Sequence, residues 1–296
     1  MQTPHVALAT FFLLLAAIGG AWAADPAAYL AARDRANAIE QKAQAASVAP
    51  SKAEEARLWA AIEAPLRVLV GSQPPNGFSA PAKISPEKLL YGDVGAGALD
   101  GFSYRATDGA GSVVVTTDGL LRRWLKRTKT DYADAKFPTE PKQALQSDNF
   151  YTRAIEIYYP VMIIEPLPIR TPATAKDALA LLMEVREDKS SETPTNISVT
   201  LQKGERVYIA VVQAKTKLAP DADCARGRAA LEEKTVGVPL NDQKAIDDAD
   251  RLAATAEAGF QACWTEQVQH QGLLPTLTDE AQQIADDLAK SPRCGQ

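Results

Sequence analysis

Five basic residues without an intervening acid form the most concrete candidate for a binding surface in this sequence. They lie in a chain whose formal net charge is −5. The run consists of Arg122, Arg123, Lys126, Arg127 and Lys129, with Trp124 among them. We expect it to dock an anionic partner, such as an acidic protein or an envelope polymer, with Trp124 as an exposed anchor. The alternative is an ordinary solvated helix face with Trp124 in the core.

Two acids beside aromatic residues form the second candidate site. Glu156 and Glu165 flank Tyr158 and Tyr159, and a pair of carboxylates is the minimum requirement of a glycoside hydrolase. Alternation along a half-buried strand explains the same pattern, with Glu156 toward solvent and Glu165 before a turn at Pro166. The separation between the carboxyl groups decides between these interpretations, and it is a property of the folded chain.

The sequence lacks the residues that histidine-based catalysis or a metal site needs. His270 is the one histidine outside residues 1–23, so a His-rich catalytic zinc shell cannot form. At a helix end, a histidine more often stabilises the helix dipole than acts in catalysis. Four aspartates follow or precede glycines without matching the spacing of an EF-hand loop: Asp93, Asp100, Asp108 and Asp118. We therefore expect no metal.

Nucleotide and nucleic-acid binding are also poorly supported. Residues 92–100 resemble a phosphate loop superficially, but Asp100 occupies the sixth position of G-x-G-x-x-G, where a pyrophosphate would approach. No Lys-Ser or Lys-Thr pair follows these glycines, and turn formation explains them better. A mildly acidic chain also lacks the basic footprint typical of nucleic-acid binding proteins. We expect no cofactor.

The first 23 residues have the features of a secretory signal. Residues 6–18 are apolar, and Ala21, Trp22 and Ala23 have the small-x-small form of a cleavage site. No second apolar run approaches the ~20 residues that a membrane-spanning helix needs. The mature chain is therefore expected to be exported, either to the periplasm or outside the cell.

Three cysteines in such a compartment predict one disulfide and one further thiol. Counting helical rise from the expected turns favours Cys263 with Cys294. Cys224 is the alternative partner of Cys263.

The remaining pattern predicts an α+β fold: an antiparallel sheet of hairpins packed by N-terminal helices, with a mainly helical C-terminal region. The expected division is an N-terminal helical segment at 24–71, a proline-rich linker at 72–91, an α+β core at 92–220 and a helical region at 221–296. Alternating residues predict hairpins at 102–117 and 197–214 and strands at 150–165. Helices are expected at 118–129, 174–185 and 242–270 and from 278 onward. Pro65 is expected to end or kink the second N-terminal helix.

Taken with the missing catalytic residues, these features favour an exported, non-enzymatic protein that binds a protein or wall polymer in the cell envelope. The alternative is a carboxylate-based hydrolase acting on an envelope glycan. The sequence predicts no particular oligomeric state.

Overall fold

The structure is a computed structural model that describes part of the chain. The described residues are 26–46, 51–71, 73–79, 101–127, 161–185, 196–219, 224 and 243–291.

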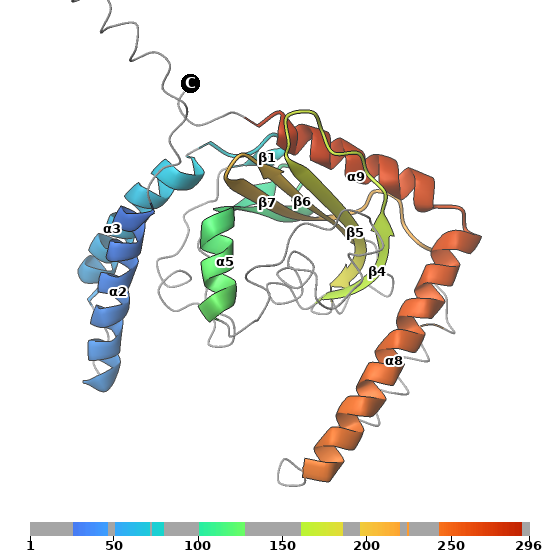
Figure 1. Cartoon of the computed structure of the whole chain (residues 1–296), viewed down its shortest axis with the longest axis horizontal. Coiled ribbons are helices and arrows are strands. Elements are labelled where there is room, and N and C mark those ends of the chain that lie inside the picture. Colours follow the sequence, from blue (N-terminus) through green and yellow to red (C-terminus); the bar gives the residue numbers. More distant parts are fainter. Residues whose placement is uncertain are drawn as a thin grey trace, which may run out of the picture.

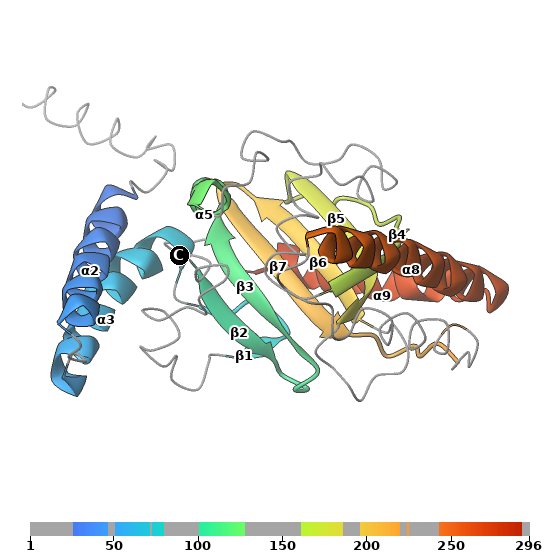
Figure 2. The ribbon, with the colours of Figure 1, turned by 90° about the horizontal axis from the view of Figure 1, so that it is seen from below.

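An antiparallel sheet of seven strands forms the centre of the molecule (Figures 1 and 2). Its strands are β1 (Phe78–Ser79), β2 (Phe102–Ala106), β3 (Gly111–Thr117), β4 (Val161–Leu167), β5 (Asp177–Val185), β6 (Asn196–Lys203) and β7 (Arg206–Gln213). Their order across the sheet is β1-β2-β3-β7-β6-β5-β4. The predicted α+β class is therefore confirmed.

Both predicted hairpins are present, because their turns are encoded locally. In the β2–β3 turn, Gly109 has φ +76°, and the Asp108 carboxylate accepts a hydrogen bond from the Ala110 amide at 2.9 Å. In the β6–β7 turn, Gly204 has φ +60°, which is a conformation that favours glycine. The two hairpins join side by side through the pairing of β3 with β7.

The helix predicted at 174–185 is wrong, since this segment forms β5. Ala, Leu, Met and Glu all have good helix propensity, which explains the prediction. In the sheet, however, β5 lies between β4 and β6. Leu179, Leu181 and Met183 are buried on one face of it, and Ala180 and Leu182 are buried on the other. Burial on both faces outweighs a local preference for helix.

The turn expected at Pro166 is also wrong, because Pro166 is part of strand β4. Pro166 pairs with Leu181, and the register shifts between Ile163 and Glu165. A proline and a bulge are both tolerated at a sheet edge, where one side of the strand has no neighbouring strand. Residues 150–160, which were expected to form further strand, lie outside the described residues.

Five helices surround the sheet within the described part of the chain. They are α2 (Ala27–Ala45), α3 (Lys52–Val70), α5 (Asp118–Arg127), α8 (Gln243–His270) and α9 (Leu274–Ala289). Helix α3 is capped at its start, where the Ser51 hydroxyl accepts a hydrogen bond from the Glu54 amide at 3.3 Å. Among these described helices, none is long and apolar enough to cross a membrane.

Pro65 lies inside α3 and does not end it, since residues 66–70 continue the helix. The buried residues Leu58, Ile62, Leu66 and Val70 continue at every fourth position through the proline. The helix keeps one apolar face against the core, and this burial offsets the hydrogen bond that proline removes.

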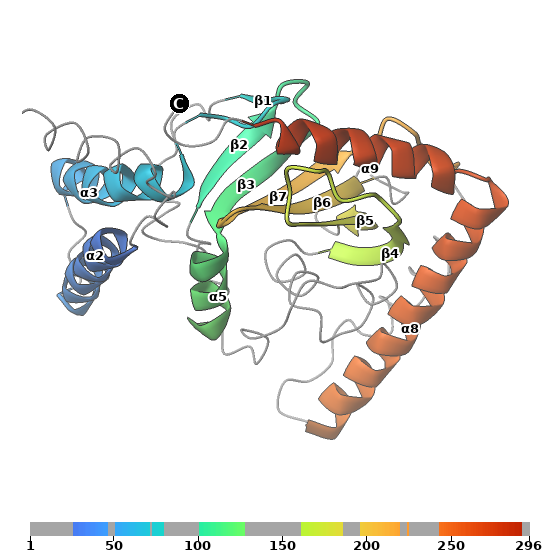
Figure 3. The same cartoon turned by 45° about the horizontal axis from the view of Figure 1, so that its top comes forward.

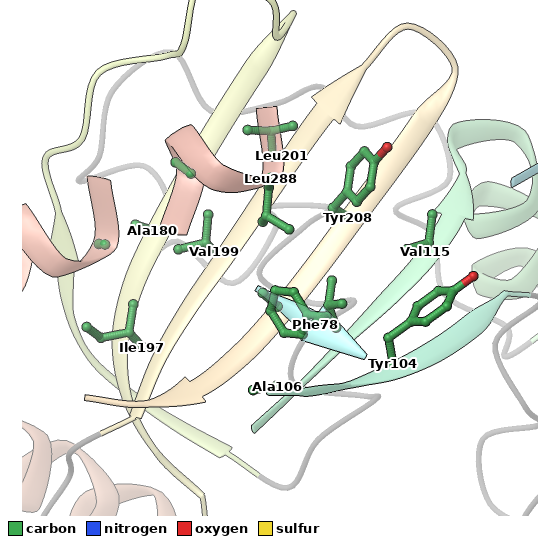
Figure 4. Packing of buried hydrophobic residues seen from close by; sticks show 14 of the residues in the cluster. Phe78, Tyr104, Ala106, Val115, Ala180, Ile197, Val199, Leu201, Tyr208 and Leu288 are labelled. Atoms are coloured by element: carbon green, nitrogen blue, oxygen red, sulfur yellow. The ribbon is translucent and has the colours of Figure 1, made fainter. Parts of the chain in front are cut away.

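Helix α9 lies across one face of the sheet (Figure 3). It begins four residues earlier than expected, at Leu274, with a proline in its first turn. Its buried residues Leu277, Ala281, Ala285 and Leu288 belong to the same hydrophobic core as the sheet. Leu288 lies over Val199 and Leu201 of β6 in Figure 4. The sheet and α9 thus share one core, while the predicted domain boundaries stay predictions.

Candidate functional site

Helix α5 carries the predicted basic run and follows directly on strand β3. Its first turn is capped by Thr117, whose hydroxyl accepts the Leu120 amide at 3.2 Å. Asp118 is the first residue of the helix. Leu120 and Leu121 are buried, so the helix packs by its apolar side.

The first two arginines of the run already contact carboxylates of the same chain. Arg122 donates to Asp118 at 2.8 Å, within one turn of α5. Arg123 lies 3.4 Å from Asp34 of α2, and the two side chains are 36% and 66% exposed. An exposed ion pair of this kind contributes ~0–1 kcal/mol to stability, so it holds Arg123 only weakly.

The rest of the basic run is not tested. The side chains of Trp124, Lys126 and Arg127, and Lys129 as a whole, lie outside the described part of the structure. That the positive charge continues along α5, and that Trp124 is an exposed anchor, stay predictions.

An open groove of about 410 Å³ lies at the other end of the sheet, between α8 and the edge strand β4. Its lining residues come from both elements: Ile164, Glu165, Ala258, Gln261, Ala262, Thr265, Glu266 and Gln269. The two elements are joined where the Thr265 hydroxyl donates to the Ile164 carbonyl at 3.0 Å. On α8, the buried residues Phe260, Trp264 and Val268 recur at every fourth position and hold the helix against the core.

Glu165 is the predicted acid that the structure places in a groove. Its predicted companion, Glu156, lies outside the described residues, so the separation of that pair stays untested. The structure instead brings Glu266 of α8 into the same groove. Sequence reasoning missed Glu266, Gln261 and Gln269. These three residues are three to five positions apart, and they lie next to the buried positions of α8. This spacing was the sequence pattern that could have indicated them.

The lining of this groove limits the ligands that it suits. Among the lining residues that the structure describes are two carboxylates and two amides, and none of these described residues is basic or aromatic. Sugar sites usually provide aromatic faces, and anion sites provide basic groups. A glycosidase also needs a carboxyl group kept protonated by an apolar environment. Glu165 is half-buried and Glu266 is exposed, which suits binding better than acid catalysis.

The disulfide joins Cys263 to Cys224, with 5.8 Å between their Cα atoms. The pairing of Cys263 with Cys294 is therefore wrong in this structure, and the alternative partner is the one present. That prediction rested on helical rise counted from the expected turns. The chain instead passes the far end of α8, where the Ala219 amide donates to Gln271 at 3.1 Å. Cys263 lies eight residues before Gln271, which is ~12 Å along the helix, and Cys224 lies five residues after Ala219 in the sequence.

The described residues contain no group of three or more His, Cys, Asp or Glu side chains that could hold a metal ion. Asp108 accepts a hydrogen bond within a turn, and Asp118 pairs with Arg122. His270 is the exposed last residue of α8.

Comparison of the chain with protein-family models, with curated proteins and with solved structures gives no match.

Proposed function

We propose that the protein acts outside the cytoplasm, in the periplasm or as a secreted protein, as a non-enzymatic binding protein of the cell envelope. Its partner is a macromolecule with exposed acidic groups, either an acidic protein or an anionic wall polymer. The observation that carries this proposal is the position of Arg123, which lies at the surface of α5 beside an exposed carboxylate.

The Arg123–Asp34 pair supports the proposal because a partner can replace it at low cost. Asp34 is the more exposed of the two side chains. A carboxylate from a partner can therefore take its place without burying an unpaired charge. A basic helix on an acidic protein also steers an acidic partner toward itself during diffusional encounter.

Export rests on the signal-like features of residues 1–23. The Cys224–Cys263 disulfide is compatible with an oxidising compartment, where such bonds persist. The mature protein recovered from its compartment is expected to begin at Ala24, which N-terminal sequencing checks.

A carboxylate-based hydrolase acting on an envelope glycan is the second candidate. The observation in its favour is that Glu165 and Glu266 line one open groove. The exposure of Glu266 argues against it. Release of soluble fragments from purified wall glycan by the native protein, lost in Glu165→Gln, would establish this activity in place of simple binding.

The binding proposal is tested by affinity capture from an envelope extract. The bait is the mature chain, and the α5 variant replaces four basic residues by glutamate: Arg122, Arg123, Lys126 and Arg127. Capture of the partner is expected to fall by about tenfold or more, which corresponds to ~1.4 kcal/mol. A matched control changes four exposed basic residues elsewhere to glutamate: Lys215, Lys217, Lys244 and Arg251.

The control variant is expected to capture as much partner as the native protein. Far-ultraviolet circular dichroism verifies that both variants are folded. If the α5 variant captures the same partners in the same amounts, the proposed role of the basic helix is wrong.

A further inference from the structure

An ion pair between two helices occupies Arg123 of α5. The Arg123 guanidinium donates to the Asp34 carboxylate of α2 at 3.4 Å, and the two residues are 89 positions apart in the sequence. Figure 2 shows α2 and α5 at the end of the sheet that β1, β2 and β3 form. The Arg123 side chain therefore already contacts a carboxylate before any partner binds.

The packing of both helices keeps Asp34 beside Arg123. Tyr29 and Ala36 of α2 belong to the hydrophobic core, and Leu120 of α5 belongs to the same core. The fold thus holds the Asp34 carboxylate near Arg123, where it competes with a ligand at an effective concentration on the order of millimolar. A ligand with one carboxylate at lower concentration does not displace it.

The preceding residue, Arg122, also contacts an acid of the same chain. Asp118 lies four residues earlier on α5 and pairs with Arg122 at 2.8 Å. A single carboxylate from a partner replaces one such contact by an equivalent one, with little net gain in affinity. A partner with several adjacent carboxylates reaches both arginines, and its second contact then forms within the complex at a high effective concentration.

We propose that Asp34 is an internal competitor for Arg123, and that α5 therefore selects an acidic protein whose glutamates or aspartates are adjacent. This inference rests on the proposed function. It names the class of partner and the contact within this chain that limits the affinity for that partner.

The experiment measures the binding of two labelled peptides to the mature protein by fluorescence anisotropy, at roughly 0.05 M salt. One peptide carries a run of adjacent glutamates. The other carries the same number of glutamates separated by glycine and serine, so both have the same charge. The test variant is Asp34→Asn. The matched control is Asp248→Asn on α8, which removes the same charge and also breaks an exposed ion pair, the one with Arg251.

The native protein is expected to bind the peptide with adjacent glutamates about tenfold or more tightly than the spaced peptide. Asp34→Asn is expected to tighten binding of the adjacent peptide about threefold, whereas Asp248→Asn changes it less than about 1.5-fold. In an Arg123→Gln background, Asp34→Asn is expected to have no larger effect than the control, because the contact for which Asp34 competes is gone. Far-ultraviolet circular dichroism verifies that every variant is folded.

Three outcomes overturn the inference. The first is equal tightening by Asp34→Asn and Asp248→Asn, and the second is equal affinity of the native protein for the two peptides. The third is a native protein that binds purified anionic wall polymer through α5 but binds neither peptide, in which case the proposed function stands. Conversely, capture from the envelope extract that does not depend on α5 contradicts the proposed function, even where the preference between the peptides is observed.

Discussion

At the scale of residues, Tyr104 shows how burial and nearby charge act on one side chain. It is 3% exposed on β2, and its ring makes an edge-to-face contact with Phe102 at 6.5 Å. Burial raises the pKa of the Tyr104 hydroxyl, while the positive charges of Arg67 and Arg206 oppose this shift. Figure 4 shows Tyr104 and Tyr208 on the same face of the sheet with Val115 near them.

This raised pKa predicts a loss of stability at alkaline pH. Above the ordinary tyrosine value of 10.0, the unfolded chain loses the proton of Tyr104 while the folded protein retains it. The free energy of unfolding therefore falls as pH rises from the unfolded pKa toward the folded one, and this contribution is complete below pH ~10. Tyr104→Phe keeps the ring contact and removes this part of the alkaline loss. Urea unfolding at several pH values measures it, and identical pH slopes for both proteins would contradict it.

Some single residues were identified by the alternation of apolar and polar side chains along a strand. Phe102 and Tyr104 alternate with Ser103 and Arg105 in the predicted hairpin, and both aromatic residues are buried. Glu266 was missed because its neighbours in the groove come from a strand about a hundred residues earlier in the chain. No local pattern shows such a relation.

At the scale of elements, α9 is fixed to the sheet by side chains that bond to backbone groups. Glu280 accepts the amides of Lys215 and Thr216 at 2.8 and 2.9 Å. Gln282 accepts from the Arg170 amide at 2.7 Å and donates to its carbonyl at 3.0 Å. Near the end of the helix, Lys203 donates to the carbonyls of Ala289 and Ser291 at 2.5 and 2.7 Å. These contacts set the position of α9 along the sheet, which its apolar stripe alone would leave free to slide.

Lys203 is therefore expected to contribute to stability more than other lysines near it. Lys203→Met removes a cation from the C-terminal end of α9 and takes a donor away from the Ser291 carbonyl, whereas the Ala289 carbonyl keeps the Thr174 hydroxyl at 3.1 Å. The expected cost is ~1–3 kcal/mol in the free energy of unfolding. Lys290→Met is the matched control, because Lys290 lies at the same helix end but forms an exposed pair with Asp287. It is expected to cost at most ~0.5 kcal/mol. Equal losses in urea unfolding of the two variants would show that the Lys203 contacts contribute little.

The disulfide ties the segment after β7 to α8 and predicts a further stability effect. It closes a loop with a sequence separation of 39 residues. Replacing Cys224 and Cys263 together by serine is expected to lower the free energy of unfolding by ~3–4 kcal/mol. Peptide mapping without reduction is expected to find these two cysteines linked. A peptide that links Cys263 to Cys294 would contradict the structure, and Cys294→Ser is the control that leaves stability unchanged.

At the scale of the whole molecule, the sheet separates two surfaces of opposite charge. Arg123 lies on α5 after β3, and Glu165 and Glu266 line the groove beside β4. Three strands, β7, β6 and β5, lie between the strands that carry these two surfaces. The proposed binding function depends on the surface of α5, and the second candidate function depends on the groove.

The sequence by itself determined the features whose causes are local. The hairpin turns at Asp108–Gly109 and Gly204 need glycine at positive φ, and the capped start of α3 needs an acceptor at Ser51. Only the tertiary structure decided the features that depend on distant residues. Asp177–Val185 is a strand because β4 and β6 flank it, and Cys263 pairs with Cys224 because the chain after β7 passes the end of α8. The physical reason is that turn and cap energies act within a few residues, whereas burial and groove formation depend on which segments pack together.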